Sequence, residues 1–371
     1  MGIDIHQTIT PVAAAWDALA DEVGAAPFMR PDWFAIWSEA FGVTDVRFVA
    51  LTRGGRLAAV VPLVERHGAM RSATNLHSPM FDIVAADEAA AHDLAAGVFA
   101  SRPRSVILKL VDPDARSTRA WLAGAVDAGY QTRAEPILNS PFIDTTRPWE
   151  EYESRLGTKV KSDLRRRRRR LDDQGHVTIE VHDGSVGLEA LLHEGFRVEA
   201  AGWKGAAGTA IASSPTTRRF HGQIARWAAE RGLLRLCFLR LDGVALAFHY
   251  DIEADGVYYA VKGGYDEEFR RFSPGKMLRM EAIEGAFARD IVRYEFLGAN
   301  EPYKLEWADQ LRTLVLAQAF RSSVPGRVER LAYSHGRPFA KRAMVRVRWF
   351  RKLHSGRGPV SVSDGPSDGP R

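Results

Sequence analysis

The chain has 371 residues, of which 46% are hydrophobic, 26% charged and 10% aromatic. This composition is typical of a folded globular protein and excludes a disordered or fibrous chain. The net charge of +5 is unevenly spread: residues 321–371 hold 12 Lys/Arg and 3 Asp/Glu, so the first 320 residues carry 39 basic and 43 acidic side chains. Any argument for nucleic acid or lipid binding must therefore rest on local patches.

The cysteine content and the hydropathy pattern bear on location. Cys237 is the single cysteine, so the chain forms no internal disulfide and suits a reducing compartment. No apolar run reaches the roughly 18–20 residues that a membrane-spanning helix needs. We read no export signal or lipid anchor at the N-terminus and expect a cytoplasmic protein.

The first half of the chain predicts one α/β unit. Residues 46–51 and 57–64 are strand-like and flank Gly54-Gly55, which indicates a β-hairpin. A further strand at 105–110 precedes a helix from about 116 to 128.

The second half repeats this device and extends it. Strands at 234–241, 244–252 and 257–262 are separated by the turn dipeptides Asp242-Gly243 and Asp255-Gly256, which predicts an antiparallel meander. A helix from 273 to about 289 then leads to a strand at 291–297, so the last two strands should lie parallel. We therefore expect an α/β protein with two related units at 1–140 and 141–320.

Two basic segments accompany these units. Six consecutive arginines, residues 165–170, lie in a helix predicted over 159–171. Residues 321–353 predict a basic helical tail, which could lie on anionic lipid, and residues 354–371 a disordered end. Arginine runs are usually solvated helix faces, and this one has no interleaved aromatics for base stacking.

The strongest local signal is Ser273-Pro274-Gly275-Lys276, placed between strand and helix. Serine is a preferred N-cap because its hydroxyl accepts a backbone N–H, and proline is favoured at the first helical position. Glycine lets a ligand approach the backbone, where free N–H groups attract phosphate. The motif predicts either an anion site or simply a well-capped helix.

The order of these elements resembles the core of the GCN5-related N-acetyltransferase (GNAT) superfamily. Further motifs are similar to its CelD-like branch and, more distantly, to Fem-type aminoacyltransferases, which place two GNAT-like units in one chain. These motifs are Glu199-Ala200-Ala201-Gly202-Trp203-Lys204-Gly205, Lys262-Gly263-Gly264-Tyr265-Asp266, Tyr294-Glu295-Phe296-Leu297-Gly298 and Tyr303-Lys304-Leu305-Glu306-Trp307. The resemblance covers roughly residues 30–320 and implies two tandem GNAT-like units with mixed, mostly antiparallel sheets flanked by helices.

The resemblance implies acyl transfer from acyl-CoA or acetyl-CoA to an amine, with no metal. The usual superfamily loop is Arg/Gln-x-x-Gly-x-Gly/Ala, whereas this chain, counted from Arg271, has Pro274 at the fourth place and Lys276 at the sixth. The residues implied to bind the co-substrate lie on the strand before this loop and on the loop itself: Tyr259, Val261, Lys262, Arg270, Arg271, Ser273, Gly275 and Lys276.

Direct attack by an amine needs no protein nucleophile, but it needs proton transfer and a polarised carbonyl. The acid–base candidates are Glu295, Tyr303, His249 and Glu199. We rank Glu295 and Tyr303 first because they follow the crossover helix. Each also has a structural interpretation: a histidine inside a strand is often only hydrogen-bonded, and Glu295 could hold Lys304 or an arginine. Backbone N–H groups near Ala260 are candidates for the oxyanion site.

Substrate contacts are expected from Trp203, Lys204 and Lys304. The acceptor is predicted to be an amine of a small metabolite or of a surface-polysaccharide sugar. Two alternatives stay open: Fem-like transfer from aminoacyl-tRNA to a peptidoglycan precursor, and a GNAT fold that binds a partner without turnover. The tail makes peripheral attachment to the inner membrane surface a further hypothesis.

Overall fold

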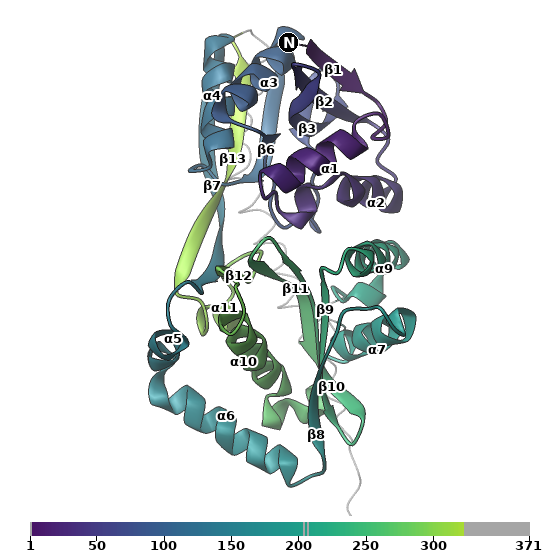
Figure 1. The fold of residues 1–371 in the computed structure, drawn as a ribbon, viewed down its shortest axis with the longest axis vertical. Coiled ribbons are helices and arrows are strands. Elements are labelled where there is room, and N and C mark those ends of the chain that lie inside the picture. The colour runs from purple at the N-terminus through teal and green to yellow at the C-terminus, as the bar shows by residue number, and fades with distance from the viewer. Residues whose placement is uncertain (1, 203–204, 206–207, 323–371) are drawn as a thin grey trace, which may run out of the picture.

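The computed structural model describes residues 2–202, 205 and 208–322. The predictions made for Trp203, Lys204, the basic tail and the C-terminal end concern residues outside the described part of the chain. Two units lie one above the other in Figure 1, and strands β7 and β13 run side by side between them.

The N-terminal unit contains strands β1 to β7 and helices α1 to α4, with α3 connecting two parallel strands. Its elements are β1 (Gly2–His6), α1 (Ala13–Glu22), the 3-10 turn η1 (Pro27–Met29), α2 (Pro31–Phe41), β2 (Val46–Arg53), β3 (Arg56–Arg66), β4 (Ala69–Ser72), β5 (Val84–Ala85), α3 (Glu88–Ala100), β6 (Ser105–Val111), α4 (Arg116–Asp127) and β7 (Tyr130–Asp144). The predicted hairpin is β2–β3, and the predicted strand and helix are β6 and α4, so these predictions are confirmed.

The C-terminal unit contains the predicted meander and crossover. Its elements are α5 (Trp149–Arg155), α6 (Gly157–Asp172), β8 (Val177–His182), α7 (Leu188–Ala200), the 3-10 turn η2 (Ile211–Ser213), α9 (Pro215–Glu230), β9 (Leu234–Leu241), β10 (Val244–Ala254), β11 (Val257–Tyr265), the 3-10 turn η3 (Glu267–Phe272), α10 (Pro274–Phe287), β12 (Arg293–Glu295), α11 (Pro302–Leu305) and β13 (Gln310–Arg321). Strands β9, β10 and β11 are antiparallel and β12 is parallel to β11, which confirms the predicted topology.

All strands belong to one sheet of 13, in the order β1-β2-β3-β4-β6-β13-β7-β12-β11-β10-β9-β8, with β5 paired to β3. The final strand, β13, lies between β6 and β7, far from its neighbours in the sequence. Strand β7 starts in the N-terminal unit and its last residues, Phe142, Ile143 and Asp144, pair with β12. The two units are therefore joined through shared strands.

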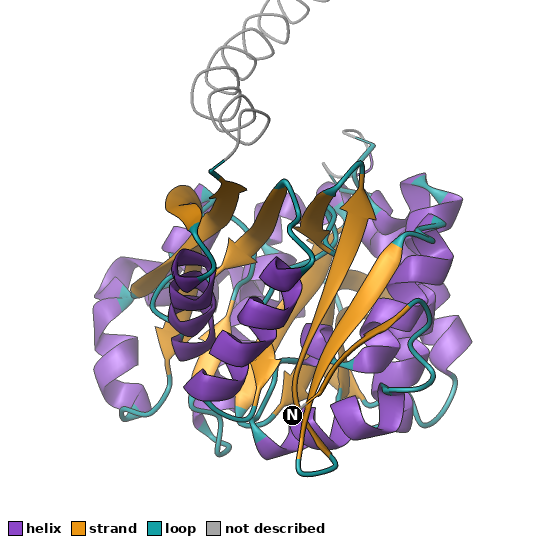
Figure 2. Ribbon diagram, turned by 90° about the horizontal axis from the view of Figure 1, so that it is seen from above, coloured by secondary structure: helices purple, strands orange, loops and turns teal. Residues whose placement is uncertain are grey.

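Helices cover both faces of the sheet (Figure 2). In the C-terminal unit, α10 and α6 cover one face, with Leu164, Leu171 and Leu278 in the same buried cluster as Tyr258 and Tyr294. Helices α7 and α9 cover the opposite face, and their buried residues join the core of the N-terminal unit. Within the described residues, no helix has the length and apolar content to span a membrane.

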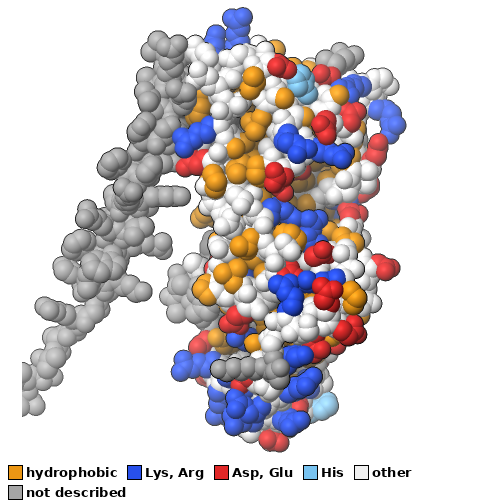
Figure 3. Space-filling model, turned by 90° about the vertical axis from the view of Figure 1, so that its left-hand side faces the viewer, with side chains coloured by type: hydrophobic (Ala, Val, Ile, Leu, Met, Phe, Trp, Pro, Cys, Tyr) orange, Lys and Arg blue, Asp and Glu red, His pale blue; other side chains and the backbone are white. Residues whose placement is uncertain are grey.

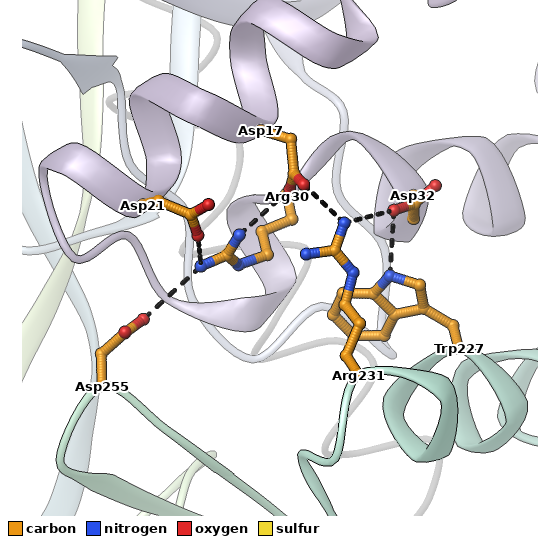
Figure 4. Close-up of polar contacts among 7 residues, drawn as sticks. All are labelled: Asp17, Asp21, Arg30, Asp32, Trp227, Arg231 and Asp255. Atoms are coloured by element: carbon orange, nitrogen blue, oxygen red, sulfur yellow. Dashed lines mark hydrogen bonds and ion pairs between the residues drawn. The ribbon is translucent and has the colours of Figure 1, made fainter.

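A group of ion pairs fixes the two units against each other (Figure 4). Arg30 is 4% exposed and contacts Asp17 at 3.0 Å, Asp21 at 2.6 Å and Asp255, in the β10–β11 turn, at 3.6 Å. From the C-terminal unit, Arg231 at the end of α9 reaches Asp17 at 2.5 Å. Because Arg30 is buried, its charge depends on these carboxylates from both units for stabilisation.

Candidate functional site

Strands β11 and β12 form a fork. They pair over three residues only, Val257↔Arg293 to Tyr259↔Glu295. Beyond Glu295 the chain follows β7, because Phe296 N donates to Pro141 O at 3.1 Å, while β11 continues along β10 as far as Tyr265. The backbone of residues 260–265 therefore has a strand on one side and the diverging arm of the fork on the other.

A β-bulge lies where the fork begins. Tyr250 pairs with Lys262 and Ile252 pairs with Tyr259, so Ala260 and Val261 together lie opposite Asp251. A bulge turns peptide groups out of the ladder. The Val261 N–H lies close enough to the Asp251 carboxylate to oppose the rise of its pKa, so we take the Ala260 N–H as the candidate donor toward the fork.

Asp251 is a functional candidate that the sequence analysis missed. Its side chain is fully buried, it accepts the Tyr258 hydroxyl at 2.9 Å, and burial raises its pKa to about 7. On the same face Arg279 of α10 donates to the Tyr294 hydroxyl at 2.5 Å, and the rings of Tyr258 and Tyr294 stack at 4.9 Å. The one signal in the sequence was an acidic residue inside the apolar strand β10.

Glu295 lies at the apex of the fork. It is 1% exposed, and its Oε1 accepts ion pairs from Arg312 at 2.9 Å and Arg293 at 3.2 Å. Its Oε2 is buried and has no hydrogen-bond partner among the described residues. Burial raises the pKa of this carboxyl, and the two arginines oppose that shift. The carboxylate therefore combines a fixed position with one oxygen that accepts no hydrogen bond from the described residues.

His249 and Glu199 lie against β11 from opposite faces, at two glycines. A Cβ on Gly263 would come within 2.7 Å of His249 Cδ2, and a Cβ on Gly264 within 2.7 Å of Glu199 Cα. Both predicted acid–base residues are buried, and Glu199 accepts the backbone N–H of Ile211 at 2.8 Å. The two glycines let His249 and Glu199 pack directly against the end of β11, so both residues lie close to the fork.

The start of α10 corrects one prediction. Ser273 is at the N-cap position but has φ 56° and ψ 49°, and its side chain makes no capping hydrogen bond. Its carbonyl oxygen instead accepts the N–H groups of Lys276 at 3.0 Å and Met277 at 3.2 Å. This left-handed backbone directly follows the η3 turn. Pro274 occupies the first helical position, as predicted.

The basic side chains around this helix start remain on the surface. Lys276 pairs with Glu306 at 2.5 Å, and Arg270 pairs with Glu267 at 3.7 Å. The Arg271 guanidinium lies over the Phe272 ring at 4.6 Å. Exposed ion pairs contribute little free energy, so an incoming phosphate can replace these carboxylates. A Cβ on Gly275 would come within 3.0 Å of the Tyr265 ring, which covers the opening residue of the loop.

Tyr303 and Lys304 lie on α11, the short helix that follows β12 in the chain. Desolvation raises the pKa of Tyr303 to about 12, so its hydroxyl keeps its proton at neutral pH. Lys304 is 7% exposed and its Nζ contacts Leu297 O at 2.5 Å, Ala299 O at 3.1 Å and the Glu301 carboxylate at 2.7 Å. All three of its N–H groups are used, so the geometry gives Lys304 a role in holding the loop after β12 rather than a free cation for substrate.

The remaining co-substrate residues lie on β11. Tyr259 is paired with Glu295 and its ring contacts Phe28 of the N-terminal unit at 5.4 Å. Lys262 lies near enough to His77, from the N-terminal unit, to lower its pKa, although burial is the larger cause of that shift. Within the described residues, no group of three or more His, Cys, Asp or Glu side chains is placed to hold a metal ion.

Comparison with known proteins agrees with this architecture. Residues 158–305 match the family model of the acetyltransferase (GNAT) domain. No curated protein matches the chain by sequence. FemX superposes with a TM-score of 0.58 at 14% identity, over 89% of this chain and 99% of FemX.

Two further solved structures share the fold. The C-terminal domain of a proposed lysylphosphatidylglycerol synthetase from Agrobacterium fabrum superposes with a TM-score of 0.54 at 13% identity, over 84% of this chain and 92% of that domain. A protein of unknown function from Bacteroides thetaiotaomicron gives a TM-score of 0.53 at 11% identity, over 86% and 100% of the two chains. At these identities the likeness concerns the fold alone.

Residues 158–305, in the C-terminal unit, are therefore similar to the acetyltransferase (GNAT) domain, within a mixed, mostly antiparallel α/β fold. That domain begins at α6 and includes the fork, the bulge and the start of α10. The match supports an acyltransferase.

Proposed function

We propose that the protein is a thioester-dependent N-acyltransferase that uses acyl-CoA and acts in the fork between β11 and β12. The observation that carries this proposal is the fork itself: two parallel strands part at Glu295, a buried carboxylate with one oxygen that has no partner in the described part of the chain. The pantetheine arm is proposed to bind along β11 beyond Tyr259, on the side from which β12 has turned away. The start of α10 and its basic neighbours receive the phosphate.

The reaction is direct attack of an amine on the thioester carbonyl. The Ala260 N–H is the donor we assign to the developing oxyanion, because the bulge turns it out of the ladder. A new C–N bond forms, the C–S bond breaks, and the thiolate leaves on the co-substrate.

Proton transfer is assigned to two groups. The Glu295 Oε2 accepts the proton that the amine loses, since its raised pKa brings it closer to neutrality than an ordinary carboxylate. The Tyr303 hydroxyl, protonated at neutral pH, is the donor for the leaving thiolate. His249 and Glu199 flank the arm of β11 and position its backbone.

The acceptor we propose is an amine of a small metabolite or of a surface-polysaccharide sugar, in line with the resemblance to the CelD-like branch. Acetyl-CoA is the simplest donor to test. A cytoplasmic location, with the basic tail at the inner membrane surface, belongs to the same proposal.

The test is calorimetric titration with acyl-CoA and measurement of thiol release with a panel of amines. The G275D variant places a carboxylate at the start of α10 and should weaken acyl-CoA binding at least about tenfold, or roughly 1.4 kcal/mol. The matched control is G285D on the same helix, where a Cβ meets only the end of the Arg289 side chain. Equal binding by both variants, or no thiol release with any amine, would overturn the proposal.

A second candidate is Fem-like transfer from aminoacyl-tRNA. The observation that favours it is the superposition on FemX, which includes both units and 99% of that chain. Filter binding of charged tRNA at low and high salt tests it. Strong, salt-dependent affinity together with aminoacyl transfer would favour this candidate over acyl-CoA.

A further inference from the structure

The arginine helix α6 packs beside the start of α10. Leu164 and Leu171 are 8% and 0% exposed and hold one face of α6 on the body of the unit. Arg167, from the flank of α6, donates to the backbone carbonyl of Arg271 in η3 at 2.6 Å. The helix is thus fixed to the turn that leads into the phosphate-binding end of α10.

The outer face of α6 is a stripe of four exposed arginines, Arg165, Arg166, Arg169 and Arg170, which we call the outer arginine stripe. Their spacing of one and four residues places them on one side of the helix. In Figure 3 blue side chains gather at the lower end of the molecule, where Figure 1 places α6.

The charge of the stripe is only partly neutralised. Arg166 pairs with Asp163 at 2.5 Å and Arg165 is 4.0 Å from Glu153. Arg169 and Arg170 make no ion pair with any described residue. Arg270 and Arg271 belong to η3, which is bonded to α6 through Arg167 and leads directly into α10.

The start of α10 offers little backbone to hold a diphosphate. Pro274 has no N–H, and those of Lys276 and Met277 donate to the Ser273 carbonyl. Within the first four residues of the helix, the Gly275 N–H is the one without a backbone acceptor in the described chain. Such a loop suits a single phosphate better than the diphosphate of CoA.

From these two observations we infer that the acyl group is delivered by an acidic carrier protein, whose phosphopantetheine arm is attached through one phosphodiester. The carrier protein docks on the outer arginine stripe and its arm enters the fork past Gly275. This inference rests on the proposed function, because CoA and a carrier protein share the same thioester arm. Acyl-CoA then acts as the smaller and less efficient donor.

The stripe fits an acidic protein surface better than nucleic acid or a membrane. It extends along about 8 Å of helix, whereas nucleic acid binding commonly uses 6–10 phosphate contacts. No aromatic side chain lies on α6 for base stacking. A helix that inserts into a membrane needs an outward apolar face, and the apolar face of α6 is buried.

The experiment compares two donors that carry the same acyl group, acyl-CoA and an enzymatically acylated bacterial acyl carrier protein. Binding of the holo carrier is measured by fluorescence anisotropy at 50 and 200 mM salt, and kcat/KM by acyl transfer to an amine. We expect higher kcat/KM with the carrier and binding that weakens as salt rises. The variant R169E/R170E should lower kcat/KM with the carrier at least tenfold and leave that with acyl-CoA within about twofold.

The matched control is R218E/R219E, two adjacent exposed arginines on α9, on the opposite face of the sheet. It should change neither donor. An equal loss with both donors in R169E/R170E, or no effect on the carrier, overturns the inference. The inference is also overturned if the protein binds tRNA, R169E/R170E abolishes that binding, and the acylated carrier protein is not a donor. Failure of both thioester donors would instead refute the proposed function.

Discussion

The N-terminal and C-terminal units each place a helix between two parallel strands that part after three paired residues. In the N-terminal unit these are β4 and β6, paired at Ala69↔Ser105 to Arg71↔Ile107. There the gap is closed by the chain itself: Lys109 N donates to Ser72 Oγ at 3.0 Å, and Phe81 N donates to Leu110 O at 3.0 Å. In the C-terminal unit β12 leaves β11 after Glu295 and turns to β7, where Phe296 N donates to Pro141 O at 3.1 Å.

The helices α3 and α10, which connect these parallel strands, also differ in how their N-termini are capped. The N-cap of α3 is Asp87, whose carboxylate accepts the Ala90 N–H at 2.5 Å and pairs with Arg53 at 3.2 Å. The N-cap of α10 is Ser273, which has no side-chain cap. The capping carboxylate repels phosphate where α3 begins, whereas the N-cap residue of α10 is an uncharged serine. One topology therefore gives a closed support in one unit and an open fork in the other.

The sharpest way to break this comparison is to neutralise one acid of raised pKa in each unit. Glu295→Gln should lower kcat at least about 100-fold, because it removes the proton acceptor but keeps the shape. In the N-terminal unit Asp82, whose pKa burial raises to about 6, provides the control Asp82→Asn, which should leave kcat unchanged.

The pH dependence separates a chemical role of Glu295 from a structural one. The wild-type rate should fall as pH drops through the raised pKa of Glu295, since a protonated carboxyl accepts no proton. Steady-state rates from pH 5 to 9 test this. If E295Q keeps the fall in rate at low pH, Glu295 is not the proton acceptor. If D82N loses as much activity as E295Q, the N-terminal unit is not merely a support.

Asp251 gives the C-terminal unit a stability signature of its own. Its pKa is about 7 in the folded protein and about 4 in an unfolded chain, so between these values the native state keeps a proton that the unfolded state loses. The free energy of unfolding of the wild type, relative to Asp251→Asn, should therefore fall as pH rises from 4 to 7, by up to about 1.4 kcal/mol per pH unit. Urea unfolding of both proteins at four pH values measures this. Parallel curves would show that Asp251 is ionised in the fold.

The difference in helix caps is tested by giving α10 the cap of α3. Ser273→Asp adds a carboxylate at a left-handed position that aspartate tolerates. It should raise KM for acyl-CoA about tenfold through repulsion of the phosphate, and the effect should shrink in high salt. Ser273→Asn is the neutral control of the same shape. Equal KM values for the two variants would place the phosphate elsewhere.

The smallest expected effect concerns the hydrogen bond between Lys109 N and Ser72 Oγ, which closes the gap between β6 and β4. Ser72→Ala removes the hydroxyl that accepts the Lys109 N–H and should reduce the free energy of unfolding by about 1 kcal/mol. Thermal unfolding and kcat, measured together, check that stability falls without loss of turnover. A fall in kcat with unchanged stability would indicate a ligand site in the N-terminal unit.

The parts of the fold that were predicted from the sequence depend on local chemistry. The meander was found because Asp242-Gly243 and Asp255-Gly256 take positive φ at both positions of each turn, which few other dipeptides allow. Pro274 similarly marked the first turn of α10. The same locality explains the error at Ser273: its preference for capping lost to the backbone geometry that the preceding 3-10 turn imposes.

What the sequence did not predict depends on distant contacts. Asp251 looks like any strand residue until β11 and α10 cover it. Among the described residues, both arginine partners of Glu295 contact Oε1, and one of them, Arg312, comes from the distant strand β13. The arginines at 165–170 separate into an outer stripe and inner contacts only once Leu164 and Leu171 fix the rotation of α6.

The position of β13 has a consequence for biosynthesis. Strand β13 pairs with β6 and β7, which leave the ribosome roughly 180 residues before it. At about 5–20 residues per second, the edges of β6 and β7 wait on the order of ten seconds or more for their partner. During that interval the nascent N-terminal unit exposes unpaired strands, so the newborn chain needs protection from aggregation until its last strand arrives.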